Sequence, residues 1–96
     1  MKKYLITILC NDTQPDYYND IYVDTIPTLF DTREECEKVL HKQLYDECQS
    51  LNEDTDDSVL FVPTKDNKIV YELDINGIYV PQYWVSQYNI IELEIN

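Results

Sequence analysis

Glycine, alanine and basic residues are the scarcest components of this chain. It contains a single glycine and no alanine, so it has no glycine-rich loop of the kind that cradles phosphate groups. Seven lysines and arginines stand against 19 aspartates and glutamates, which gives a net charge of −12. That charge disfavours direct binding to nucleic acid or to an anionic membrane, and it favours a basic protein partner.

Long apolar runs and paired cysteines are also missing. The apolar run over residues 4–10 is at the lower limit for a signal peptide, and Leu9 stands where lipoprotein cleavage needs a small side chain. No run approaches the roughly twenty apolar residues of a membrane helix. Cys10, Cys36 and Cys48 are too widely spaced for a zinc or redox pair. We expect buried thiols and a cytoplasmic protein.

The remaining pattern predicts a single α+β domain over residues 1–96, with elements in the order β-β-α-β-β-β. The sheet is expected to be mainly antiparallel with about five strands, and one helix should pack on one of its faces. Asn76-Gly77 is a strong two-residue hairpin signal, and we expect Pro81 to interrupt the strand that starts after it. The expected strands are 3–10, 20–27, 58–63, 69–75 and 88–95.

The expected helix covers residues 32–51. Thr32 followed by Glu35 matches a capping box, with Asp31 as the competing N-cap. Apolar residues recur at helical spacing and define one buried stripe. They are Cys36, Val39, Leu40, Leu44, Cys48 and Leu51.

Alternation along the strands predicts an acidic outer face. Mostly apolar residues at alternate positions are expected to point towards the helix. These are Ile21, Val23 and Thr25, then Ile69, Tyr71, Leu73 and Ile75, then Ile91, Leu93 and Ile95. The opposite face would then collect Asp20, Asp24, Glu72, Asp74, Glu92 and Glu94. Like charges facing each other across strands are destabilising, so a face of one sign suggests a role in binding.

Catalytic and metal-binding patterns are weak. The acidic stretch 52–57 lacks the glycine and the glutamate that a calcium-binding EF-hand loop needs, which leaves a weak calcium site over residues 54–57 or a solvated acidic loop. His41 and Cys48 lie about two helical turns apart, roughly 10 Å along the axis, and cannot meet. We therefore expect no cofactor and no enzymatic activity.

Aromatic residues complete the binding prediction. The chain has nine tyrosines and one tryptophan. Those that fall near turns or among polar positions are Tyr17, Tyr18, Tyr22, Tyr79, Tyr83, Trp84 and Tyr88. Tyrosine and tryptophan are enriched at interface hot spots. The residues predicted to bind a partner are Asp20, Tyr22, Asp24, Asp54, Asp56, Asp57, Glu72, Asp74, Trp84, Glu92 and Glu94.

The chain is rich in Ile, Asn, Asp and Tyr, whose codons are AT-rich, which indicates a low-GC genome. In size, acidity, low-GC bias and lack of a catalytic motif, it resembles small phage-encoded nucleic-acid mimics, including anti-CRISPR proteins. The resemblance implies an inhibitor that occupies the nucleic-acid-binding surface of a basic partner, with carboxylates in place of phosphates and aromatic side chains as anchors. The alternative is a small intracellular interaction or regulatory module, for instance a homodimer paired through an edge strand, whose acidity serves solubility.

Overall fold

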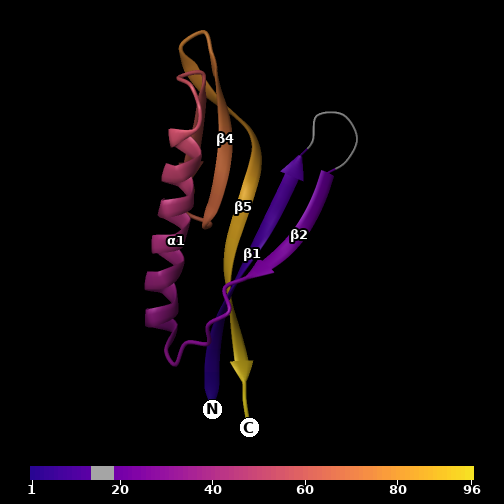
Figure 1. Cartoon of the computed structure of the whole chain (residues 1–96), viewed down its shortest axis with the longest axis vertical. Helices are drawn as coiled ribbons and strands as arrows, with labels where there is room; N and C mark the ends of the chain where they lie inside the picture. Colours follow the sequence, from indigo (N-terminus) through magenta and orange to yellow (C-terminus); the bar gives the residue numbers. More distant parts are fainter. Residues whose placement is uncertain (14–18) are drawn as a thin grey trace.

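The computed structural model describes the backbone of residues 1–13 and 19–96, and the side chains of residues 1–11 and 21–96. The predicted α+β class and the element order β-β-α-β-β-β are confirmed (Figure 1). The elements are β1 (Lys2–Thr13), β2 (Asn19–Thr25), α1 (Arg33–Glu53), β3 (Val59–Pro63), β4 (Lys68–Ile75) and β5 (Ile78–Glu94). The molecule is elongated, with extents of 55 × 28 × 20 Å.

The sheet is antiparallel throughout, with the strand order β2-β1-β5-β4-β3. Its central strand β5 is long, and the two neighbouring strands pair with different segments of it. The first neighbour, β1, pairs with Ser86–Glu94, whereas β4 pairs with Ile78–Gln87. The hairpins β1–β2 and β3–β4 are therefore staggered along β5, and they diverge from each other in Figure 1.

Proline 81 does not interrupt this strand, contrary to the sequence prediction. It pairs with Glu72 inside the continuous strand β5, next to a register shift between Tyr71 and Glu72. Proline is tolerated in sheets at such irregularities because the ladder of hydrogen bonds is locally disrupted there. The predicted turn before it is confirmed, since Asn76 and Gly77 have φ angles of 55° and 87°, as the tight hairpin turn requires.

The helix forms as its sequence predicts. The side chain of Thr32 accepts a hydrogen bond from the backbone N–H of Glu35 at 3.2 Å, which satisfies one of the free donors of the first turn. The stripe of apolar residues is buried against the sheet, with Leu40 and Leu44 at its centre. No helix in the part of the chain that the structure describes has the apolar length needed to cross a membrane.

Helix α1 packs on one face of the sheet, which we call the helix face; the other is the open face (Figure 1). The fully buried strand residues Ile6, Ile69 and Tyr88 all belong to the helix face. The predicted inward direction of Ile69, Tyr71 and Leu73 agrees with this, and it leaves Glu72 and Asp74 on the open face.

The predicted directions are wrong for β2 and β5. Ile8 lies opposite Asp24, and Tyr4 lies opposite Glu92; because Tyr4 and Ile8 alternate with the buried Ile6, Asp24 and Glu92 belong to the helix face. The apolar residues of these strands point the other way, on to the open face; they are Ile21, Val23, Ile91 and Leu93. The predicted single acidic face therefore does not form.

Candidate protein-binding surface

The open face of the sheet is mainly apolar. The strand register places ten large apolar side chains, four charged ones and several uncharged polar ones on it, among them Thr7, Gln87 and Asn89. The apolar residues are Leu5, Leu9, Ile21, Val23, Leu60, Val62, Val70, Trp84, Ile91 and Leu93, and the charged residues are Lys3, Lys68, Glu72 and Asp74. Among the described residues, no second layer of structure packs on this face, so its side chains are covered only by their neighbours.

Exposure differs between the open face and the part of the helix face that α1 covers. Val23 and Ile21 on the open face are 62% and 56% exposed, and Ile91 is 41% exposed. By contrast, Ile6 and Ile69 on the helix face are 0% exposed. Scattered exposed apolar residues are ordinary, whereas apolar residues gathered on one sheet face over several strands make that face a candidate surface for contact with another molecule.

The two acidic residues of the open face lie near one end of it, whereas Lys68 lies opposite Gln87 in the middle of β5. Glu72 and Asp74 alternate on β4 near the Asn76-Gly77 turn, whereas Lys3 lies near the start of β1. The ammonium group of Lys3 is paired with the carboxylate of Asp31. The carboxylates of Glu72 and Asp74 have no such ion pair with a described residue.

Trp84 is the one tryptophan, and it lies half-buried on the open face beside Val70. A register shift follows between Ile69 and Val70, and the side-chain Nδ2 of Asn11 donates to the backbone carbonyl of Trp84 at 2.8 Å. The irregular backbone is thus held by β1 across the sheet. This anchors the backbone of Trp84 close to the point where the pairing of β1 with β5 ends.

Four of the other predicted binding residues lie on the helix face. On the edge strand β2, Tyr22 and Asp24 are exposed. On β5, Glu92 lies 3.6 Å from the ammonium of Lys2, and Glu94 lies 3.4 Å from the terminal amine. The side chain of Asp20 lies outside the described residues, as do Tyr17 and Tyr18.

The predicted acidic loop contains local hydrogen bonds. Asp54 caps the C-terminus of α1 by donating its N–H to the carbonyl of Leu51. The hydroxyl and N–H of Ser58 bond to the Asp56 carboxylate and lower its pKa, and the carbonyl of Asp57 accepts from the hydroxyl of Tyr79 at 2.6 Å. Within residues 1–11 and 21–96, no three His, Cys, Asp or Glu side chains are grouped closely enough to hold a metal ion.

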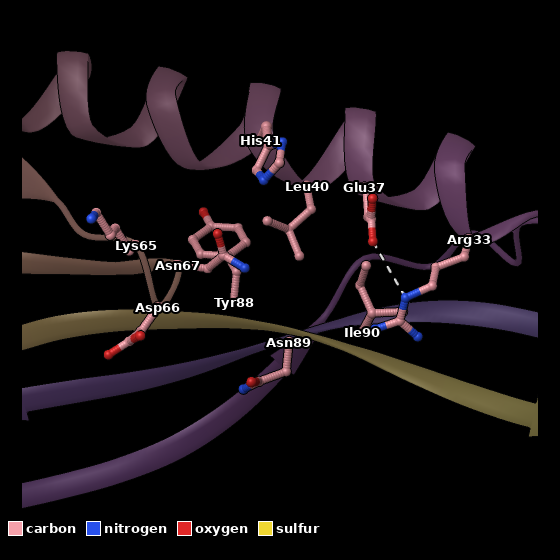
Figure 2. Close-up of a pocket in the computed structure, with 10 residues that line it drawn as sticks. All are labelled: Arg33, Glu37, Leu40, His41, Lys65, Asp66, Asn67, Tyr88, Asn89 and Ile90. Atoms are coloured by element: carbon pink, nitrogen blue, oxygen red, sulfur yellow. Dashed lines mark hydrogen bonds and ion pairs between the residues drawn. The ribbon is translucent and has the colours of Figure 1, made fainter.

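A hollow of about 430 Å³ lies between the N-terminal half of α1, the β3–β4 turn and β5 (Figure 2). Arg33, Glu37 and His41 line it from the helix, and Lys65 and Asp66 line it from the turn. The guanidinium of Arg33 is 3.3 Å from the Glu37 carboxylate. Its floor is formed by the β5 residues Tyr88, Asn89 and Ile90.

A second hollow, of about 260 Å³, lies between the C-terminal half of α1 and the strands β1, β2 and β5. Its polar group is the Glu47 carboxylate, which accepts hydrogen bonds from Ser86 at 3.4 Å and Tyr88 at 3.3 Å. Burial raises the pKa of the nearby Cys10 thiol, as it does for Cys36 and Cys48. These thiols are therefore protonated at neutral pH, and the thiol is the weakly nucleophilic form.

The sequence reasoning missed the apolar open face and the bond network of Glu47. A signal for the first was present, because residues 4–9 and 59–62 are apolar at both alternations and so must place apolar side chains on both faces. Comparison of the chain with family models, with curated proteins and with solved structures found no match.

Proposed function

We propose that this chain acts by binding another protein, and that the open face of its sheet is the docking surface. The observation that carries the proposal is the exposure of Ile21, Val23 and Ile91 on a face with no covering layer. Interface cores are depleted of charge and enriched in aromatic and large apolar residues, and Trp84 supplies a rigid aromatic anchor. The net charge of −12 favours a basic partner.

The proposal is tested by affinity purification from the native host, followed by binding measurements with the purified partner. The variant Ile21→Lys with Val23→Lys places two charges in the open face without replacing a buried residue. The matched control is Tyr45→Lys, because Tyr45 is 58% exposed on α1 and lies outside the open face. We expect the wild-type chain and the control to retain the partner and the open-face variant to lose it. Equal retention by both variants, at unchanged melting temperature, would overturn the proposal.

A second proposal concerns the nature of the partner, namely a nucleic-acid-binding protein whose nucleic-acid surface the chain occupies. It is supported by the net charge of −12 and by Glu72 and Asp74, which alternate on β4 beside the apolar open face. Carboxylates two residues apart on a strand are separated by about 6.6 Å, a spacing comparable to that of phosphates along a nucleic-acid strand.

Competition separates this second proposal from docking alone. Nucleic acid should displace the chain from its partner, and the affinity should fall steeply with salt. Reversing Glu72 and Asp74 to lysine should weaken binding more than reversing Glu34 and Glu35 on the exposed side of α1. A partner that binds the chain and nucleic acid simultaneously would refute mimicry and leave the docking surface in place.

A further inference from the structure

One edge of β5 has no strand beside it. On the β4 side, the register ends where Lys68 pairs with Gln87. One further backbone bond reaches this edge, from the N–H of Tyr88 to the carbonyl of Asn67. Beyond it, no described strand pairs with β5 on this side, although β5 continues to Glu94.

The hydrogen bonds of β1 show which backbone groups of β5 face this free edge. Tyr4 exchanges both of its backbone bonds with Phe30, on the outer side of β1. Its neighbours Lys3 and Leu5 must therefore direct their backbone groups towards β5, because the directions alternate along a strand. On β5, the backbone groups of Ile91 and Leu93, which lie opposite Leu5 and Lys3, point back towards β1. The residues that alternate with them, Ile90, Glu92 and Glu94, therefore direct their N–H and C=O groups to the free edge.

The free edge begins in the hollow of Figure 2. The β3–β4 turn closes one end of this hollow, and Leu40 and Ile90 provide its apolar wall and floor. The space continues the line that β4 would follow if it were longer. A chain that entered there in an extended conformation would meet unpaired backbone donors and acceptors, which is the arrangement that proteins use for recognition by strand addition.

We propose that the free edge of β5, at residues 90–94, takes up an extended segment of a basic partner protein as an added antiparallel strand. This proposal does not rest on the open-face docking proposed above. The side chains of the added strand would alternate between the two faces of the sheet. Those on the helix face would lie beside Glu92 and Glu94, and those on the open face beside Ile91 and Leu93. Lysine or arginine alternating with apolar residues matches this edge.

A second copy of the chain fits the edge poorly. Two β5 edges paired about a two-fold axis at Glu92 would set this glutamate against its own copy, and like charges directly opposite are destabilising. Lys2 and the terminal amine lie near Glu92 and Glu94. The side chains in these two ion pairs are at least half exposed, and that of Glu92 is the least exposed at 50%. Because exposed ion pairs contribute little to stability, a lysine or arginine of the added strand can join or replace them at little cost.

The probe is a fluorescent nine-residue peptide of alternating lysine and valine. In an antiparallel pair, the peptide residues that bond to Ile90 and Glu92 carry their side chains on the helix face, and these are the lysines. Methylating the backbone nitrogens of the lysines should weaken binding by about tenfold or more, because the pairing hydrogen bonds are lost. Methylating those of the valines should leave affinity nearly unchanged, since these N–H groups point away from β5.

Amide hydrogen exchange locates the peptide. Binding should slow exchange at Ile90 and Glu92 and leave Ile91 unchanged, because Ile91 already bonds to β1. The variant Ile21→Lys with Val23→Lys, which changes the open face on β2 and leaves residues 90–94 as they are, is measured in parallel. Its loss of partner binding with retained exchange protection at Ile90 and Glu92 would show that the two surfaces are separate. If both methylated peptides bind equally well, or protection does not appear at Ile90 and Glu92, strand addition is refuted.

Discussion

Tyr88 donates its phenolic hydrogen to the carboxylate of Glu47 across 3.3 Å, from β5 to the underside of α1. Tyr88 is 3% exposed, and Ser86 donates to the other oxygen of the same carboxylate at 3.4 Å. Among the described residues, the half-buried carboxylate of Glu47 therefore makes the only strongly polar contact between α1 and the centre of the sheet. Burial, and then the charge of Glu47, raise the pKa of Tyr88 well above its ordinary value of 10.0.

This shift makes the folded state sensitive to alkali. A tyrosine whose pKa is higher in the folded than in the unfolded state stabilises the fold fully below pH 10, and that stabilisation is lost as the pH rises further. We expect Tyr88→Phe to cost about 1 kcal/mol at neutral pH, because one hydrogen bond is lost, and to make the stability fall less steeply above pH 10. Urea denaturation of both proteins across this pH range measures the difference. Parallel curves would show that Tyr88 does not contribute.

The core position Leu44 tests the packing of α1. Its side chain is 2% exposed within the buried stripe, so Leu44→Ala should cost about 2–5 kcal/mol. Leu44→Asp should unfold the chain because it leaves a buried charge unpaired. The neighbouring Tyr45 is exposed, and Tyr45→Asp is the control that should leave the far-ultraviolet circular dichroism and the melting temperature nearly unchanged. A folded Leu44→Asp protein would contradict the packing.

The helix and the Asn76-Gly77 turn could be predicted from sequence because each is determined locally. The cap at Thr32 and the spacing of Cys36, Leu40 and Leu44 specify both the start and the buried side of α1. The turn residues specify their own positive φ angles. No partner elsewhere in the chain is needed to form either feature.

The faces of β2 and β5 could not be predicted in this way. Alternation shows that Val23 and Ile91 share a face with their apolar neighbours, but it does not show which face the helix covers. The sequence interpretation assigned apolar residues to the helix side, which is correct for Ile69 and wrong for Val23 and Ile91. The error arises because apolar residues occupy both faces of this sheet, so only the pairing with β1 decides.

Repulsion among the carboxylates should be visible in the response to salt. With a net charge of −12, moderate salt should raise the melting temperature because it screens interactions between exposed charges. Reductant should have no effect, since Cys36 and Cys48 are buried free thiols. A chelator should have no effect either, and calorimetry with and without it is the check. A fall of several degrees on chelation would instead support a calcium site at residues 54–57.

The last prediction concerns Asn52, which joins the end of α1 to the edge strand β3. Its Oδ1 accepts from the N–H of Phe61 at 2.8 Å, and its Nδ2 donates to the carbonyl of the same residue at 2.9 Å. One side chain thus occupies both backbone groups that Phe61 would otherwise present at the outer edge of the sheet. Such exposed edges promote pairing with other chains, and proteins commonly block them.

Asn52→Ala should therefore have two separable effects. Stability should fall by about 1–3 kcal/mol, because a half-buried donor and acceptor lose their partners. Self-association should also increase, as measured by sedimentation at rising protein concentration. The control is Gln49→Ala, about one turn earlier on the exposed side of α1, where the side chain donates a hydrogen bond to the Glu53 carboxylate at 3.4 Å. If Asn52→Ala is destabilised yet remains as monodisperse as the control, Asn52 secures the helix to β3 without protecting the edge of the sheet.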